Sequence, residues 1–364
     1  MTTGSNRRRQ FLTASTMGLA VAATTKAHGN EVLTSSCESS VADQVLASSA
    51  NWSDGLAHPI PYANPPGRGK QKGLALGGGG LILMAWYVGF FTSLKDEGVN
   101  LGDADIVVGT SAGALFGAML MNGNIWRMRD EMDLFSEFPK MLGMLLPEHT
   151  KNPSQTRASD LALTAKDASS WTIQSIGHAA ATARNDPNSS ELPGVVEKLI
   201  GMTDWASPKL YTTSNDCYTG QRLVVSHEAG IPMNVACGAS CSLPGGLGPT
   251  FLKDRICMDG GICQTSTHSD VIGGVKKAII LSLGHGTPND VTQGLRTSSL
   301  PNILFDEIKR LEASGTQTML VAVGLVPGMT HVQSIMDPAL IGPYLEYGRQ
   351  RGRAQAKEIG QFWG

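Results

Sequence analysis

One short stretch of the chain places a serine between two glycines in an order suited to a nucleophile. Residues 105–117 run Asp-Ile-Val-Val-Gly-Thr-Ser-Ala-Gly-Ala-Leu-Phe-Gly. A β-branched segment, a Gly-x-Ser-x-Gly and a small apolar segment predict strand, sharp turn and helix, which would raise the hydroxyl of Ser111 above the sheet. Gly109 and Gly113 would let strand and helix approach closely, and the N–H of Ala112 would face an oxyanion. A structural strand-to-helix turn without chemistry is the alternative.

Four glycines precede this stretch and point to the same edge of a sheet. They follow the apolar segment Gly73–Leu76, and Leu81–Asp96 has helical length. A strand-helix-strand series indicates a parallel sheet, whose active sites lie at the carboxyl ends of the strands. The patterns of dinucleotide-binding and phosphate-binding loops are absent. The glycines are therefore interpreted as oxyanion donors, and the candidates are Gly78, Gly79 and Gly80.

The serine also requires a group that accepts its proton. No local motif marks the later histidines, and we expect a surface or loop position for each: His268, His285 and His331. Asp259 follows the apolar residues 256–258 and precedes the pair Gly260 and Gly261. This order indicates a second strand-to-loop turn at a sheet edge. An ordinary Asp-Gly turn is the alternative interpretation.

Taken together, these motifs resemble the patatin-like phospholipases. The resemblance rests on four blocks in one order: 77–80, 109–113, 239–245 (Ala-Ser-Cys-Ser-Leu-Pro-Gly) and 259–261. A fifth block, from Met336-Asp337-Pro338 through residues 352–355, is similar to the ending of bacterial members. The resemblance spans about Gly73 to Lys357.

The resemblance implies a fold and a mechanism. The fold would be a three-layer α/β/α structure with a mostly parallel central sheet and a helical cap region. Ser111 would be the nucleophile and Asp259 the general base, with no histidine, no metal and no cofactor. The implied activity is hydrolysis of lipid acyl esters, of the phospholipase A type, with an acyl-enzyme intermediate.

The glycine loop departs from the family pattern. The family has Gly-Gly-Gly-x-Arg/Lys-Gly, but here the last three positions are Leu81, Ile82 and Leu83. Loss of one oxyanion donor costs about 10²–10³ in rate in other enzymes, so low or altered activity is one expectation. Two alternatives therefore stay open: a non-catalytic or weakly active lipid- or acyl-binding protein, and a non-lipid esterase or acyltransferase.

The N-terminal segment predicts export. Residues 1–29 combine Arg7-Arg8-Arg9, a short apolar region and small residues, the layout of a cleavable signal, and Arg8-Arg9 resembles a twin-arginine signal. The apolar region is too short to span a bilayer. Cleavage after Ala22 or Ala27 would give a periplasmic or secreted protein. Residues 30–72, polar and then rich in Pro and Gly, are interpreted as a linker or an arm, and residues 73–364 as the hydrolase domain.

Composition narrows the class of partner. The 364 residues are 41% hydrophobic and carry a formal net charge of −2, which argues against a nucleic-acid binder. We expect a lipid or acyl-ester substrate and transient contact with a membrane surface; the sequence does not set an oligomeric state. Disulfides persist outside the cytoplasm, but the six cysteines favour no particular pairing. The methionine-rich residues 119–204 predict core helices or a helical cap over an apolar channel.

Overall fold

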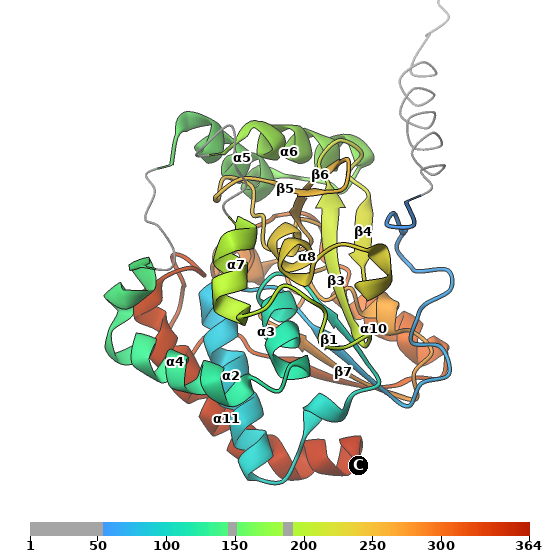
Figure 1. The fold of residues 1–364 in the computed structure, drawn as a ribbon, viewed down its shortest axis with the longest axis vertical. Helices are drawn as coiled ribbons and strands as arrows, with labels where there is room; N and C mark the ends of the chain where they lie inside the picture. Colours follow the sequence, from blue (N-terminus) through green and yellow to red (C-terminus); the bar gives the residue numbers. More distant parts are fainter. Residues whose placement is uncertain (1–53, 145–150, 185–191) are drawn as a thin grey trace, which may run out of the picture.

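A computed structural model describes residues 54–144, 151–184 and 192–364 (Figure 1). The predicted signal, residues 1–29, and the first part of the predicted linker lie outside these residues. The described domain is a central sheet with helices on both faces, which confirms the predicted three-layer α/β fold. Within the described residues, no helix is both long and apolar enough to cross a membrane.

The sheet has eight strands and is mostly parallel at its centre. Its order is β5-β6-β3-β2-β1-β7-β8, with β4 paired to β3. Strands β3, β2, β1, β7 and β8 are parallel neighbours, whereas β4 and β6 run antiparallel to β3, and β5 antiparallel to β6. The strands are β1 Lys72–Leu76, β2 Ile106–Gly109, β3 Leu210–Asp216, β4 Arg222–Val225, β5 Thr250–Leu252, β6 Arg255–Asp259, β7 Lys277–Ser282 and β8 Gln317–Ala322.

Alternation along the central strands separates two hydrophobic layers. Alternate residues, such as Leu74 and Leu76, pack with helices α2, α3 and α11 on one face. Side chains that point to the opposite face of the sheet, such as those of Ala75 and Val108, pack with α10. This period of two follows from the pleat of a strand buried on both faces. The helices are α2 Gly80–Asp96, α3 Ala112–Met121, α8 Met233–Ser240, α9 Asn289–Thr292, α10 Leu304–Ala313 and α11 Ile341–Trp363.

The methionine-rich segment forms the predicted helical cap. It comprises α4 Ile125–Glu137, α5 Pro153–Thr164, α6 Ser170–Thr182 and α7 Leu192–Ile200. In Figure 1, α5 and α6 lie at one end of the domain, near β5 and β6, while α4 lies beside α2 and α11. Met128 and Met132 of α4 are buried in the main hydrophobic core. The segment therefore contributes to the core and also covers part of the domain.

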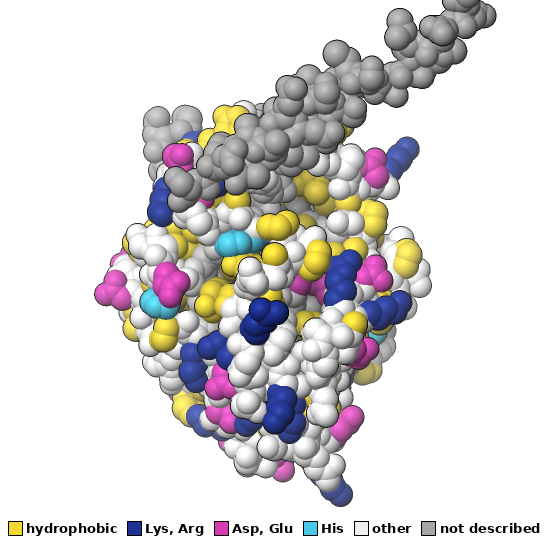
Figure 2. Space-filling model, turned by 90° about the vertical axis from the view of Figure 1, so that its right-hand side faces the viewer, with side chains coloured by type: hydrophobic (Ala, Val, Ile, Leu, Met, Phe, Trp, Pro, Cys, Tyr) yellow, Lys and Arg dark blue, Asp and Glu magenta, His cyan; other side chains and the backbone are white. Residues whose placement is uncertain are grey.

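Residues 54–71 lie against the domain rather than away from it. Leu56 is buried, and Ala57 forms a bridge to Leu223 of β4. Asp54 forms an ion pair with the buried Arg255, at 2.5 Å. Figure 2 shows charges of both signs interspersed on one face of the molecule. The cysteines that the structure describes are all unpaired: Cys217, Cys237, Cys241, Cys257 and Cys263.

Candidate active site

Ser111 lies at the sharp turn between β2 and α3, as the sequence predicts. Its φ of 53° and ψ of −118° are strained for a residue with a side chain. A Cβ on Gly113 would lie 2.0 Å from the carbonyl oxygen of Leu76, and a Cβ on Gly109 would lie 2.4 Å from that of Gly113. Only glycine fits at these two positions, so the two motif glycines allow the close approach that holds Ser111 in this conformation.

Strand register brings Asp259 to the level of Ser111. Gly109, two residues before the serine, pairs with Thr212 of β3. Two residues further along β3, Ser214 pairs with Asp259 at the end of β6. Strand β6 pairs only with the last three residues of β3, beyond the end of β2, so its own last residue lies at the level of the turn after β2. Residues 148 positions apart in sequence therefore meet through a single intervening strand.

The carboxyl group of Asp259 is buried, and one of its two oxygens accepts a hydrogen bond from a described residue. Its Oδ1 accepts a hydrogen bond from the N–H of Gly261 at 2.7 Å. Its Oδ2 has no hydrogen-bond partner among the described residues. Burial raises the pKa of Asp259 to about 7, and the Gly261 N–H and the nearby Ser111 hydroxyl partly offset this rise. The free oxygen can accept a proton in the neutral pH range.

The block 239–245 holds both turns in place. The Oγ of Ser240 accepts the N–H of Ser111 at 2.8 Å, and the carbonyl oxygen of Ser242 accepts the N–H of Asp259 at 2.8 Å. The thiol of Cys241 lies close enough for the Ser111 hydroxyl to affect its pKa, which burial raises well above its usual value. The sequence indicated this block as one of the four that carry the family resemblance, but no role was predicted for Ser240 or Ser242.

The predicted oxyanion donors differ in their availability. Gly78 lies beside the serine, because a Cβ there would be 3.1 Å from that of Ser111, but its N–H donates to the carbonyl oxygen of Ser266. Three N–H groups have no acceptor among the described residues, those of Gly79, Gly80 and Ala112. They belong to the first residues of α2 and α3 and to the glycine before α2, where helix N–H groups are unsatisfied.

None of the described histidines forms a hydrogen bond with Ser111. His285 and His331 are exposed, as predicted. His268 is in a loop, as predicted, but its side chain is fully buried. Its Nε2 lies 2.8 Å from the carbonyl oxygen of Gly260, and burial and the charge of Arg222 lower its pKa to about 4. His268 therefore supports the turn after Asp259.

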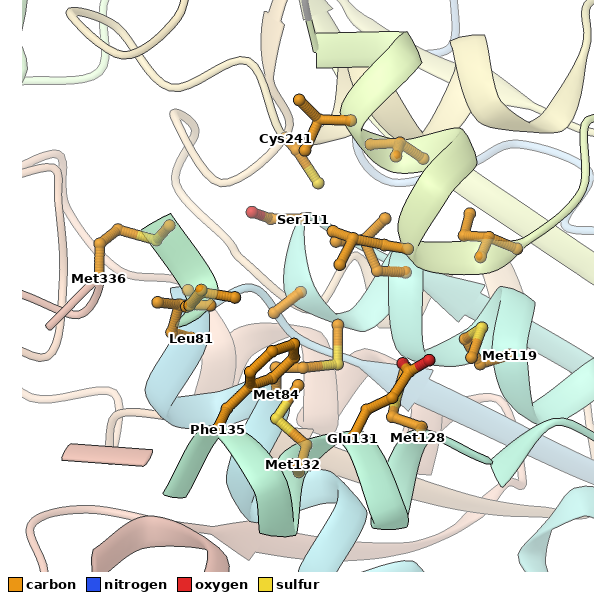
Figure 3. Close-up of a pocket in the computed structure, with 18 of the residues that line it drawn as sticks. Leu81, Met84, Ser111, Met119, Met128, Glu131, Met132, Phe135, Cys241 and Met336 are labelled. Carbon is orange, nitrogen blue, oxygen red and sulfur yellow. The ribbon is translucent and has the colours of Figure 1, made fainter. Parts of the chain in front are cut away.

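Two cavities of different character meet at Ser111. The first has a volume of about 900 Å³, including its open part, and is lined mainly by aliphatic side chains and methionines from α2, α3, α4 and α7. Figure 3 shows Leu81, Met84, Met132 and Phe135 around it, with Ser111 and Cys241 on one side. Among the described residues that line it, Glu131 is the single charged one. The second cavity also contains Gly78, Gly79 and Asp259, and is more polar.

The described part of the chain contains no cluster of side chains suited to bind a metal ion. No group of three or more His, Cys, Asp or Glu side chains with suitable geometry occurs there. The two titratable groups nearest Ser111 are the carboxyl of Asp259 and the thiol of Cys241. The arrangement thus provides a hydroxyl, an unpaired carboxyl oxygen, free N–H groups and an apolar cavity.

Comparisons with known proteins found both solved structures and a family model. The type III effector protein ExoU is 17% identical, and the match covers 84% of this chain and 56% of that chain with a TM-score of 0.34. VipD from Legionella pneumophila is 14% identical, and the match covers 80% of this chain and 67% of that chain with a TM-score of 0.39. Human GIVD cytosolic phospholipase A2 in complex with methyl gamma-linolenyl fluorophosphonate is 11% identical, and the match covers 80% of this chain and 58% of that chain with a TM-score of 0.39.

This chain spans between 56% and 67% of the length of those structures. No curated protein matches it. The family model described as "Patatin-like phospholipase" matches residues 74–271, which is more than half of the chain and includes both Ser111 and Asp259. The chain therefore belongs to the patatin-like phospholipase family.

Proposed function

We propose that the protein is a serine acyl-ester hydrolase of the phospholipase A type, with Ser111 as nucleophile and Asp259 as general base. One observation carries this proposal: the strained Ser111 lies beside a buried carboxyl group that has a free oxygen and a pKa of about 7. A base with a pKa near the working pH is effective in proton transfer. Membership of a phospholipase family supports the same activity.

The first half-reaction uses groups already in place. The Oγ of Ser111 attacks the ester carbonyl carbon while the Oδ2 of Asp259 takes the hydroxyl proton. Negative charge develops on the carbonyl oxygen, and the N–H groups of Gly79, Gly80 and Ala112 stabilise it. The C–O bond to the alcohol then breaks, and protonated Asp259 returns its proton to the departing oxygen, which leaves an acyl-enzyme on Ser111.

Water completes the reaction with the same residues. Asp259 accepts a proton from water as the water oxygen attacks the acyl carbon, and then gives that proton to the Oγ of Ser111 as the fatty acid leaves. The apolar cavity next to Ser111 has the aliphatic and methionine lining suited to an acyl chain. Leu81, the first of the three residues at which the glycine loop departs from the family pattern, lines this cavity and adds apolar surface there.

Three variants test the assignment. We expect Ser111→Ala and Asp259→Asn each to lower kcat/KM for a phospholipid and for a p-nitrophenyl acyl ester by at least 10²-fold, because a general base contributes about 10²–10⁴. His285→Asn, at an exposed histidine, is the matched control and should retain activity. A loss in His285→Asn as large as that in Asp259→Asn would rule out the serine–aspartate pair.

The alternatives give different results in the same assay series. A fluorophosphonate probe should label the wild-type protein and leave Ser111→Ala unlabelled. Absence of labelling in folded wild-type protein would support the acyl-binding alternative that the Leu81–Leu83 segment suggests. Hydrolysis of p-nitrophenyl esters without hydrolysis of phospholipids would indicate a non-lipid esterase, and transfer of the acyl group to an added alcohol would indicate an acyltransferase.

We also propose that the protein is exported. The support is the sequence of residues 1–29, with its Arg8-Arg9 pair and short apolar region. Expression of the full chain in a bacterium should give a shortened protein in the periplasm or medium. Arg8→Lys with Arg9→Lys should retain the full-length chain inside the cell, and unchanged export of that variant would contradict a twin-arginine route.

A further inference from the structure

The polar cavity on the far side of Ser111 contains one cation. It is bounded by the glycine loop, the Asp259 turn and the segments 282–284, 295–297 and 302. Its lining includes two titratable side chains, Asp259 and Arg296. Asp259 is the proton acceptor of the proposed reaction. Arg296 has no role in the reaction described above, and it lies beyond the matched range 74–271.

Arg296 is held in place by carbonyl groups rather than by a carboxylate. Its Nη1 donates to the carbonyl oxygen of Leu300 at 2.8 Å, and its Nη2 donates to that of Cys263 at 3.4 Å. It forms no ion pair with any described residue. The charge of Asp290 acts on it from a distance, but the carboxylate of Asp290 accepts backbone N–H groups of its own loop, those of His285, Gly286 and Thr287.

This arrangement leaves a partly buried cation with no ion-pair partner among the described residues. Burial lowers the pKa of Arg296, because removal of a charge from water is costly unless an opposite charge compensates it. A guanidinium has five N–H donors, of which two are engaged here. The remaining donors are available for an anion that enters the cavity, and a guanidinium binds phosphate oxygens with good geometry.

The route outward from this cavity also favours an anion. An outer cavity shares Leu243, Arg296 and Thr297 with the polar cavity, so the two adjoin. Among the described residues, its other titratable lining residues are Lys151 and His331, and none is a carboxylate. A ligand group that extends outward from Arg296 therefore meets described side chains that are cationic or neutral.

We propose that Arg296 binds a phosphate group in the alcohol part of the substrate, so that the polar cavity is a phosphate subsite. The inference rests on the proposed function, because it takes the apolar cavity as the acyl site. The ester carbon must lie at Ser111, between the two cavities. With the acyl chain in the apolar cavity, the alcohol part extends into the polar one, and in a glycerophospholipid the alcohol part carries a phosphodiester.

Arg296→Gln and Arg296→Lys test this subsite on two substrates with the same acyl chain. One is phosphatidylglycerol in mixed micelles, and the other is the neutral p-nitrophenyl ester. We expect Arg296→Gln to raise KM for the phospholipid at least ten times more than it changes KM for the neutral ester. Arg296→Lys keeps the charge and should lie between the wild type and Arg296→Gln. Arg353→Gln, at an exposed position of α11, is the control for loss of one charge.

A competition experiment identifies the bound group. Glycerol 3-phosphate should inhibit hydrolysis of the neutral ester competitively, with at least ten-fold weaker inhibition in Arg296→Gln than in the wild type. If inorganic phosphate inhibits while glycerol 3-phosphate does not, and KM for the phospholipid is unchanged, the subsite binds free phosphate and the proposal is wrong.

Two further outcomes separate this inference from the proposed function. An equal loss on both substrates in Arg296→Gln would show that Arg296 only holds the loop through the carbonyls of Cys263 and Leu300, which overturns the subsite. If the wild type hydrolyses neither substrate, the proposed function fails. Calorimetric titration of glycerol 3-phosphate into the wild type and Arg296→Gln then decides the subsite, because binding in the first and not in the second would support it and equal heats would overturn it.

Discussion

At the scale of single residues, the proposed chemistry depends on the burial and the hydrogen bonding of the Asp259 carboxyl group. Asp259 has an ordinary side chain, but burial and a single N–H donor leave it with one free oxygen and a pKa of about 7. The same burial that suits it as a base also makes its ionised form unfavourable in the folded protein. Activity and stability should therefore both depend on its protonation, in opposite directions.

The value of kcat/KM should rise as the pH increases through the pKa of Asp259. Only ionised Asp259 can accept the proton of Ser111, so kcat/KM should increase about ten-fold per pH unit below pH 7 and level off above it. A pH profile of p-nitrophenyl ester hydrolysis between pH 5 and 9 measures this. A profile that is flat from pH 5 to 8 would show that Asp259 is not the base.

Stability should change in the reverse sense. Because the folded-state pKa of about 7 lies above the usual 3.8, the folded state holds the proton more tightly than the unfolded state, and the free energy of unfolding falls as pH rises from about 4 to 7. Asp259→Asn removes this loss, so it should be more stable than the wild type by up to roughly 4 kcal/mol at pH 8.

Urea unfolding of both proteins at pH 4, 6 and 8 provides the comparison. The difference in free energy of unfolding should shrink as pH falls. A constant difference across this range would mean that the substitution acts by packing alone and that the carboxyl of Asp259 is not perturbed.

At the scale of elements, turns at one sheet edge are fixed by contacts from other segments. Block 239–245 binds the backbone of Ser111 and of Asp259. His268 binds the turn after Asp259 through the carbonyl oxygen of Gly260. The Nδ1 of His268 lies 3.4 Å from the guanidinium of Arg222, which forms a buried ion pair with Asp270. The position of the base thus depends on residues that do not touch substrate.

His268→Ala should show this indirect role. Loss of the buried ring and of its hydrogen bond should lower the free energy of unfolding by about 2–4 kcal/mol and lower kcat more than it changes KM, because the base is displaced while the cavities persist. His331→Ala, at an exposed position, should change the free energy of unfolding by no more than about 0.5 kcal/mol. Loss of stability with unchanged kcat would show that His268 supports the fold without positioning Asp259.

The low pKa of His268 adds a dependence on pH. Because His268 is neutral in the folded protein down to about pH 4, the unfolded chain takes up its proton first as pH falls below about 6.5. Stability is therefore lost between pH 6.5 and 4. In His268→Ala this part of the acid destabilisation should be absent, as urea unfolding at pH 7 and pH 5 would show.

At the scale of the whole molecule, the sheet edge separates an apolar from a polar cavity, with Ser111 between them. The apolar cavity is lined by α2, which precedes Ser111 in the sequence, and by α3, α4 and α7, which follow it. Helices α2 and α3 pack on the sheet, and α4 and α7 belong to the cap. Glycines at the contact of α2 with α11 stabilise this side: a Cβ on Gly89 would lie 2.1 Å from the carbonyl oxygen of Leu345. The cavity wall is therefore braced by the C-terminal helix.

Filling the apolar cavity should change the preference for chain length. In Figure 3, Met128 of α4 lies on the side of the cavity away from Ser111. Met128→Trp should lower kcat/KM for a sixteen-carbon p-nitrophenyl ester by about ten-fold or more, while a four-carbon ester, which stays near the serine, should change much less. Equal effects on both esters would indicate that the acyl chain lies elsewhere.

The sequence by itself determined the local elements of this site. The β-branched and small-residue runs around Ser111 predicted strand, turn and helix, because these preferences depend on near neighbours. The strand before the four glycines and the helix after them were predicted within a few residues for the same reason. The block of motifs in order was enough to indicate the family.

The tertiary structure decided which groups meet and what protonation they favour. Asp259 reaches the level of Ser111 only through its register with β3, and its pKa depends on burial that no local pattern reports. The burial of His268, the bond of the Gly78 N–H to Ser266 and the place of Arg296 beside the serine depend likewise on contacts between distant segments. Local sequence fixes backbone preferences, whereas solvation and charge at a site are set by everything that packs around it.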